Sequence, residues 1–244
     1  QQDYQGALNF LKSKNSKQNQ NLTNEISYYR AIQLFNLNKF QEALPYFENA
    51  KKSIDNTIKV MAHYWNGEAN YRLKNFQSSI LEFGEFKKVA PSESHELKLI
   101  DYQIGYSYFK LEEYSSAALA FQNFIETKIN NTSLSDDAII RLGDCFFATR
   151  DYAKAIKNYK IIVDQMATSA DYAQYQMAMS YGFLNENKDK IRELERLLIN
   201  FEISIFRDDA LFQLGNTFSA QKDPKNAHRA YRKLLQDYPK SSYT

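Results

Sequence analysis

Apolar side chains recur at helical spacing along the chain. Tyr152, Ala155, Ile156 and Tyr159 form one such group, separated by steps of three, one and three residues. Steps of three and four place side chains on one face of an α-helix, whereas a strand would alternate apolar and polar positions. The polar segment 149–151 precedes this group and has the length of a helix–helix turn. The pattern predicts a series of amphipathic helices joined by short turns.

A repeat of 35 to 38 residues organises these helices. Its first marker is a small residue near the middle of one helix, at Ala31, Gly67, Gly105, Gly143, Ala178 and Gly215. Twelve residues later the second helix carries Ala43, Ser79, Ala117, Ala155, Lys190 or Ala227, and four residues further Phe47, Phe83, Phe121, Tyr159, Leu194 or Tyr231. A glycine inside a helix costs about 1 kcal/mol relative to alanine. We therefore expect the two helices of each repeat to cross closely at the small residue, where a larger side chain would clash.

The last repeat resembles the tetratricopeptide repeat. That signature has Leu-Gly, an aromatic residue, an Ala, a Tyr or Phe and a closing Pro. The matching residues are Leu214, Gly215, Phe218, Ala227, Tyr231 and Pro239. The resemblance extends over about residues 24–240. It implies an all-α fold, a right-handed α-solenoid (superhelix) of antiparallel helix pairs with about six repeats and an N-terminal half repeat.

We expect a single array over residues 1–244. It begins with a half repeat at 1–12 and a polar loop at 12–24, followed by repeats at roughly 24–57, 60–93, 98–131, 136–168, 171–203 and 208–241. The fifth repeat has lost markers at Asn187 and Lys190, and we expect it to be irregular. Because the chain opens on a second helix and its last residues resemble the start of a further repeat, we expect it to be part of a larger multi-repeat bacterial protein.

Composition and motifs argue against catalysis and against nucleic-acid binding. The 244 residues carry 31 Lys and Arg and 29 Asp and Glu, a formal net charge of +2, whereas a strong grip on nucleic acid needs a basic excess or stripe. The glycine-rich and nucleophile motifs of common enzymes are missing from the sequence. Cys145 is the only cysteine, and His63, His95 and His228 belong to different repeats. We expect no enzyme activity, no cofactor, no metal site and no membrane-spanning helix.

The resemblance implies that the first helices line a concave groove that holds the partner. Counted from the small residue, the groove positions lie three before it, one after it and four after it. The predicted partner-binding residues are Tyr28, Phe35, Tyr64, Glu68, Tyr71, Tyr102, Tyr106, Phe109, Ile140, Asp144, Tyr175 and Phe212. Tyrosine suits such a surface, because it offers a large rigid ring with a polar tip.

Two interpretations of these aromatic positions stay open. Rings at helical spacing often pack inside an array, and we favour packing for the third groove position, which includes Phe35 and Phe109. Five of the six residues at the first position are aromatic, so contact with a partner is as good an interpretation there as packing. Some family members bind the carboxylate tail of heat-shock chaperones through a Lys and an Asn in the groove. Only Asn216 matches that pair by type, so we do not expect a chaperone adaptor.

The sequence therefore predicts a non-catalytic scaffold that binds a protein or peptide segment. The last repeat is similar to repeats of bacterial envelope proteins, including the Tol–Pal accessory protein and the outer-membrane-assembly lipoprotein. This similarity implies a periplasmic or envelope-associated location, with the cytoplasm as the alternative. Two other functions stay open: the end repeats could stack into a homo-oligomer, or the array could be the regulatory or docking segment of an enzyme whose catalytic domain lies outside these residues.

Overall fold

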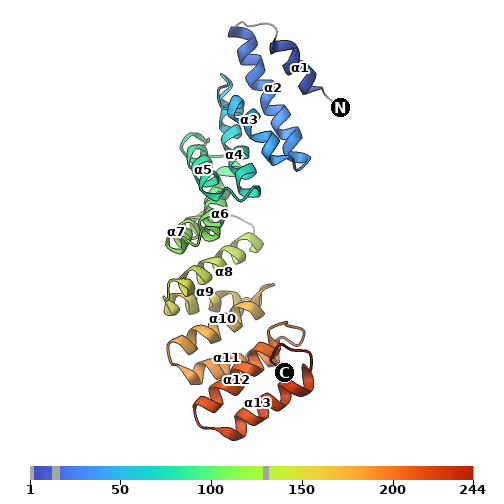
Figure 1. Ribbon diagram of the computed structural model, residues 1–244. Helices are drawn as coiled ribbons and strands as arrows, with labels where there is room; N and C mark the ends of the chain where they lie inside the picture. The colour runs from blue at the N-terminus through green and yellow to red at the C-terminus, as the bar shows by residue number, and fades with distance from the viewer. Residues whose placement is uncertain (1–2, 13–16, 129–131, 244) are drawn as a thin grey trace. The chain divides into compact units, whose positions relative to one another are not determined.

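A computed structural model describes residues 3–12, 17–128 and 132–243. The described residues form thirteen α-helices and no strand (Figure 1). This confirms the all-α fold built from helix pairs. The chain divides into two compact units, residues 1–127 and 128–244, which we call the N-terminal unit and the C-terminal unit. That both units belong to one uninterrupted array stays a prediction.

The described part of the N-terminal unit contains seven helices, each packed against the next along the chain (Figure 1). α2, α4 and α6 are the first helices of three repeats, and α3, α5 and α7 are their second helices. α1 is the expected second helix of the half repeat. The bounds are α1 (Tyr4–Lys12), α2 (Lys17–Asn36), α3 (Phe40–Ala50), α4 (Asn56–Arg72), α5 (Phe76–Val89), α6 (His95–Lys110) and α7 (Tyr114–Glu126).

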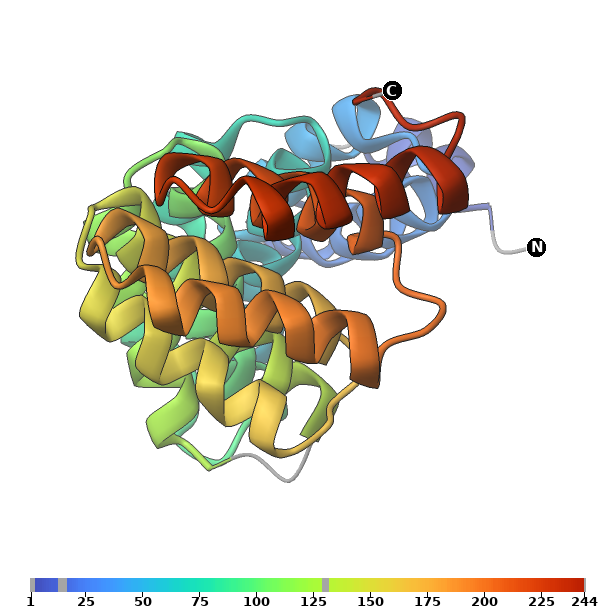
Figure 2. The same ribbon diagram turned by 90° about the horizontal axis from the view of Figure 1, so that it is seen from below.

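The described part of the C-terminal unit contains three further helix pairs, and consecutive helices again pack together. Figure 2 shows α13 side-on in dark red, with the final segment of the chain turning back at its end. The bounds are α8 (Thr132–Ala148), α9 (Tyr152–Asp164), α10 (Ala170–Phe183), α11 (Asn187–Asn200), α12 (Arg207–Ala220) and α13 (Pro224–Asp237). α13 begins with an N-cap, because the Asp223 carboxylate accepts a hydrogen bond from the Asn226 N–H at 3.1 Å.

In four repeats an aromatic ring of the second helix lies against the glycine of the first helix. At three of these glycines an added Cβ atom would lie 2.6 to 2.8 Å from a ring carbon, which is closer than real Cβ contacts. The small residue is therefore required by the close crossing of the two helices, as the sequence indicated. The four pairs are Gly67 with Phe83, Gly105 with Phe121, Gly143 with Tyr159, and Gly215 with Tyr231.

All six turns between the helices of a pair share one backbone geometry. The first helix is followed by a residue with positive φ, and the next N–H donates to a carbonyl five positions earlier, as Asn75 does to the Asn70 oxygen at 2.8 Å. This is the Schellman motif, which usually has glycine at the left-handed position. Here every left-handed residue has a side chain, with φ between 58° and 64°: Asn38, Lys74, Glu112, Arg150, Asn185 and Lys222.

The helix of the first repeat begins earlier than expected. α2 begins at Lys17, so the polar loop expected over 12–24 is wrong for residues 17–24, while residues 13–16 lie outside the described residues. Lys and Gln are good helix formers, and α1 packs along α2. The polarity of this segment therefore marks a solvated helix surface rather than a loop.

The fifth repeat keeps the backbone of the others although it has lost sequence markers. Its turn has the same bond, from the Glu186 N–H to the Tyr181 oxygen at 2.9 Å. Lys190 stands where other repeats have Ala or Ser, and Gly182 provides the space, because a Cβ atom there would lie 3.0 Å from Lys190 Cδ. Lys190 Nζ then donates to the Gln213 side-chain oxygen at 3.0 Å. The expected irregularity is absent from the backbone of this repeat, since the change at Gly182 compensates the change at Lys190.

Alanine substitution should have opposite effects at two helical glycines. Gly67→Ala should lower the free energy of unfolding by about 1–3 kcal/mol, because the new methyl group collides with the buried Phe83 ring. Gly84→Ala in α5 should raise it by about 1 kcal/mol, because nothing lies within 4 Å of the added Cβ atom and alanine is the better helix former. Urea denaturation of both variants checks this. A neutral or stabilising Gly67→Ala would contradict the close crossing.

A second prediction concerns the left-handed turns. Lys74→Gly should raise the free energy of unfolding by up to about 1 kcal/mol, because glycine adopts the φ of 64° without the steric penalty of a side chain. The matched control is Lys59→Gly, an exposed lysine within α4, which should lower stability by about 1 kcal/mol. Thermal or urea unfolding of the two variants distinguishes them, and an equal loss in both would rule out strain at the turn.

Candidate functional site

The first helices α2, α4, α6, α8, α10 and α12 carry all twelve predicted binding residues. We call the surface that these residues form within each unit the first-helix face. Ten of the twelve are half-buried, including Tyr71, Tyr106 and Asp144. The other two, Tyr64 and Ile140, are 9% and 4% exposed and belong to the core. The prediction therefore selected positions at the border between core and surface.

Rings at the third groove position pack against the second helix of their own repeat. Four repeats share an edge-to-face pair with centroids 5.0 to 5.5 Å apart: Phe35 with Phe40, Tyr71 with Phe76, Phe109 with Tyr114, and Phe147 with Tyr152. The fifth and sixth repeats lose both rings together, having Gly182 with Asn187 and Ser219 with Pro224. Two rings that pack against each other are expected to be lost together. One side of each of these rings therefore packs within its own repeat.

Tyrosines at the first groove position also pack against rings of the second helices. The Tyr64 ring lies 6.2 Å from Phe83 and 5.3 Å from Phe86 between centroids. Tyr102 repeats this geometry in the next helix pair, 6.2 Å from Phe121 and 5.1 Å from Phe124. Tyr28 is half-buried, and burial raises the pKa of its hydroxyl. Contacts with the second helices restrict the motion of the Tyr64 and Tyr102 rings, and only the rest of each ring surface is available to a partner.

Two rings of the C-terminal unit are covered by later segments of the chain. Tyr175 stacks on Phe206 with centroids 5.5 Å apart, and Phe212 stacks on Tyr243 at 4.1 Å. A serine hydroxyl donates to an aspartate at 2.7 Å beside each stack, from Ser204 to Asp171 and from Ser241 to Asp208. Residues 238–243 therefore make the contacts that 201–206 make one repeat earlier. Phe212 is less accessible than the sequence implied, because Tyr243 lies on its ring.

Glu68 lies in a polar contact between α4 and α6. Gln103 of α6 donates from Nε2 to the Glu68 carboxylate at 2.5 Å and to the Tyr64 hydroxyl at 3.0 Å. Burial raises the pKa of Glu68, although the charge of Arg72 opposes the shift. The Gln103 side-chain oxygen is buried and has no hydrogen-bond partner. Glu68, a predicted partner-binding residue, thus links two first helices.

Asp144 of α8 has a similar role in the C-terminal unit. Its Oδ1 accepts hydrogen bonds from the hydroxyls of Tyr159 on α9 and Tyr172 on α10, at 2.8 and 2.9 Å. Its Oδ2 accepts from Arg141 at 2.6 Å, and the side chain is 9% exposed. Burial raises the pKa of Asp144 despite the nearby arginine, and it also raises the pKa values of both tyrosines. The carboxylate joins three helices.

A sequence signal for this contact exists within the repeats. Where the second helix presents a tyrosine to the small residue, the residue that follows the small residue accepts a hydrogen bond from the tyrosine hydroxyl. Tyr231 donates to the Asn216 oxygen at 2.7 Å, as Tyr159 does to Asp144. Where the second helix has Phe47 or Leu194, the corresponding residue is apolar (Ile32 or Met179), whereas Phe83 and Phe121 correspond to Glu68 and Tyr106. The partners Gln103, Tyr172 and Arg141 lie outside the predicted groove positions and were missed.

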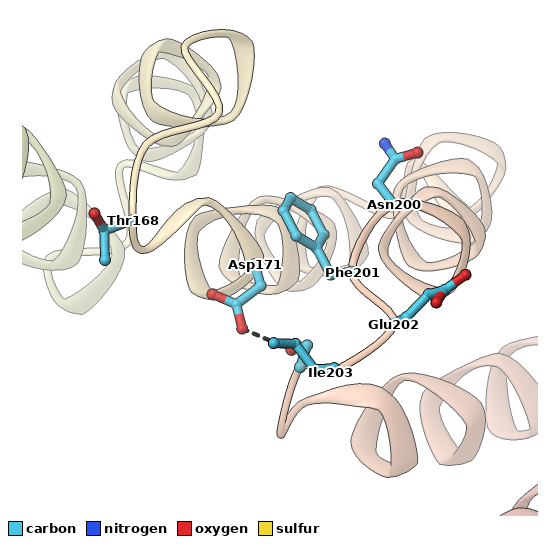
Figure 3. A pocket seen from close by; sticks show the side chains of 7 residues that line it. Thr168, Asp171, Asn200, Phe201, Glu202 and Ile203 are labelled. Carbon is cyan, nitrogen blue, oxygen red and sulfur yellow. Dashed lines mark hydrogen bonds between the residues drawn. The ribbon is translucent and has the colours of Figure 1, made fainter.

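A pocket of about 520 Å³ opens beside the loop between α11 and α12 (Figure 3). Figure 3 shows Asp171 pointing toward this loop, where it accepts the Ser204 hydrogen bond. Ile203 and Ile205 are 98% and 80% exposed. Phe201 and Glu202 also line the pocket. The loop therefore presents apolar contact area that the helical pattern did not reveal.

Cys145 and His63, two of the groups that could carry chemistry, are engaged in packing and in an ion pair. Burial raises the pKa of Cys145 to about 12, so its thiol stays protonated at neutral pH. His63 bonds to Glu82 at 2.8 Å, and Lys51 pairs with the same carboxylate at 2.7 Å, which lowers the pKa of Glu82. Within the described ranges, no group of three His, Cys, Asp or Glu side chains is placed to hold a metal ion. None of the helices described there is long and apolar enough to span a bilayer.

Two family models described as "Tetratricopeptide repeat" match the chain. One covers residues 102–170 and the other covers residues 209–241. A search of curated proteins finds no match. The second match coincides with the last helix pair, whose motif the sequence singled out.

Solved structures show the same fold at low sequence identity. The C-terminal part of a TPR repeat-containing protein from Cytophaga hutchinsonii has a TM-score of 0.72 at 13% identity, over 99% of this chain and 97% of that one. YrrB, described as a TPR protein with an unusual peptide-binding site, has a TM-score of 0.60 at 14% identity, over 80% and 93% of the two chains. PilW, described as a widely conserved type IV pilus biogenesis factor, has a TM-score of 0.58 at 15% identity, over 90% and 95%.

The buried Asp144 carboxyl should make stability depend on pH. Because its pKa is raised in the folded chain, the folded state holds the proton more tightly than the unfolded state. Its contribution to the free energy of unfolding therefore falls as pH rises from about 4 through the raised pKa. Asp144→Asn removes this titration, so the stability of the variant relative to wild type should increase over the same pH window. Urea denaturation at pH 4, 5, 6 and 7 measures the difference.

The matched control for this experiment is Asp164→Asn. Asp164 is an exposed carboxylate that pairs with Lys160 on the surface of α9. Both variants remove one negative charge from the C-terminal unit, so a general charge effect would appear in both. A pH dependence that is unchanged by Asp144→Asn would show that this carboxyl does not control the titration.

Proposed function

Because the chain is a tetratricopeptide repeat protein, we propose that it is a protein-interaction scaffold whose first-helix face binds an extended segment of a partner protein. The proposal places the main contacts on α4 and α6 of the N-terminal unit. These helices carry Tyr71, Tyr102 and Tyr106, which are half-buried. The function is binding without chemistry.

Rigid tyrosines are the observation that supports this proposal. Tyr106 lies edge-on to Tyr102 and to the buried Phe121, with centroids 5.0 and 5.4 Å apart. Such rings lose little conformational freedom when a partner binds, so a larger part of the contact energy contributes to affinity. Tyrosine is also enriched among the residues that dominate binding energy at interfaces.

The polar contact between α4 and α6 adds to this surface. The bonds from Gln103 to Tyr64 and Glu68 hold the two helices in one register. Arg72 and Lys110 are exposed at the last residues of α4 and α6. A bound segment would therefore meet tyrosine rings along the helices and a cation at the end of each helix.

Photo-crosslinking tests the proposal on the intact chain. A benzoylphenylalanine placed at position 106 should capture a partner from extracts of the source organism, and one placed at Leu119 on the exposed side of α7 should not capture it. The captured segment, made as a synthetic peptide, should then bind Tyr106→Ala at least tenfold more weakly than wild type, a loss of about 1.4 kcal/mol. Leu119→Ala is the matched control.

Two results would overturn the proposal. One is capture of the same segment from both positions, which would indicate adhesion without a preferred face. The other is equal affinity of the peptide for wild type and Tyr106→Ala when circular dichroism shows that the variant is folded. Tyr64 is unsuitable for this test, because it is buried and its loss would lower stability directly.

A location in the cell envelope stays part of the proposal. The similarity of the last repeat to envelope proteins of the family supports it. Self-association through end repeats and a docking role beside a catalytic domain stay predictions.

A further inference from the structure

A basic stripe runs along the exposed side of α13. Lys225, His228, Arg229, Arg232 and Lys233 are exposed, and their spacing of three, one, three and one residues places them on one face of the helix. They line an open depression of about 390 Å³, together with two residues at the end of the helix. The overall charge of +2 conceals this local concentration.

Several cations on the other second helices of the C-terminal unit pair with carboxylates. Lys160 of α9 pairs with Asp164 at 2.7 Å, and Arg196 of α11 pairs with the buried Glu193 at 3.2 Å. In the part of the chain that the structure describes, no carboxylate lies within 4 Å of the four Lys and Arg side chains of the α13 stripe. Arg232 instead donates to the His228 ring at 2.9 Å.

The stripe brings like charges close together on α13. Lys225 lies in the first turn, where the helix dipole disfavours a positive charge. Arg229 follows it by four residues and Lys233 follows Arg229 by four, and like charges at that spacing repel. Asp223 at the N-cap and Asp237 at the last position are the carboxylates nearest the stripe in sequence, and neither separates the four cations from one another. The repulsion among these side chains would be relieved by an anionic partner.

A crevice lined by apolar and charged side chains adjoins the stripe. It has a volume of about 390 Å³ and lies between α11, α12 and α13, with Leu198, Leu214 and Phe218 among its lining residues. Arg229 and Lys233 line both the crevice and the basic depression. One surface therefore offers a space for an apolar side chain directly beside unpaired cations.

We propose that this α11–α13 surface binds an acidic peptide segment of a partner protein. One large apolar side chain of the segment enters the crevice, and flanking carboxylates pair with Arg229, Lys233 and Arg232. The stripe from Lys225 to Lys233 rises about 12 Å along the helix, which an extended segment of about four residues spans. The inference does not rest on the proposed role of the first-helix face, because none of the residues that line the stripe and the crevice is a predicted groove residue.

The crevice favours a peptide over the other anions that a basic surface attracts. A lipid bilayer presents a flat charged surface, and it would leave the crevice empty. Single-stranded nucleic acid binds through rings that stack on its bases, whereas the stripe has only the His228 ring, which is engaged by Arg232. Glu195 at the other side of the crevice and Asp237 at the end of the stripe also interrupt the positive surface.

Peptide display on the whole chain tests the inference. Random dodecapeptides displayed on phage are selected on the wild type and counter-selected on the charge-reversed variant R229E/K233E. The expected result is enrichment of sequences with at least three acidic residues around a Leu, Phe or Trp. A synthetic peptide of the enriched sequence should bind R229E/K233E at least tenfold more weakly, and replacing its apolar residue with Gly should weaken binding to a similar extent.

The matched control is K157E/K160E, which reverses two exposed lysines at a similar spacing on α9. It should bind the peptide as the wild type does, and circular dichroism should show all variants folded. Enrichment without acidic residues, equal loss in the control, or indifference to the apolar residue would overturn the inference. Tighter binding of a single-stranded oligonucleotide or of phosphatidylserine vesicles than of the peptide would also overturn it. Tyr106→Ala should not change the affinity of this peptide, which separates the surface from the first-helix face.

Discussion

Contact between a large side chain on the second helix, in most repeats an aromatic ring, and a residue with little or no side chain on the first helix sets the geometry of the repeats. At Gly67 and Gly143 no methyl group fits in front of Phe83 or Tyr159, so the helices cross at the distance that a bare backbone permits. This distance determines which side chains reach the neighbouring helices. It brings the first groove position onto the rings of the second helix, and it places the residue after the glycine next to the tip of the ring.

Polar contacts in the array are consequences of this crossing. When the ring is a tyrosine, its hydroxyl arrives beside the next residue of the first helix, and Asp144 or Asn216 accepts it. The Asp144 carboxylate also accepts a hydrogen bond from Tyr172 of the following repeat and forms an ion pair with Arg141. A buried carboxylate is stable only when its oxygens have such partners. The two acids of the first-helix face, Glu68 and Asp144, therefore hold helices together. The accessible part of the face consists mainly of ring edges and hydroxyl groups.

The sequence predicted the fold well, because the spacing of small and aromatic residues records the crossing directly. It also favoured packing for the third groove position, which the pairs such as Phe35 with Phe40 support. It missed the early start of α2, because a solvated helix rich in Gln and Asn has no apolar period to detect. It missed Gln103 and Tyr172 because their contacts join neighbouring repeats, and the register between repeats depends on packing rather than on spacing along the chain. It also missed the basic stripe on α13, because the net charge of the whole chain is small.

Bonds that cross from one repeat to the next make the order of the helix pairs specific. Gln103 meets Tyr64 and Glu68 because the second and third pairs are neighbours. If the second pair were removed by recombination, Gln103 would face Tyr28 and the aliphatic Ile32 at the corresponding positions, and its buried amide would lose an acceptor. Asp144 and Tyr172 impose the same condition on the fourth and fifth pairs. The repeats of this protein share one backbone, but their contacts with neighbouring repeats differ. Duplication or loss of a repeat would therefore need compensating substitutions at these junctions.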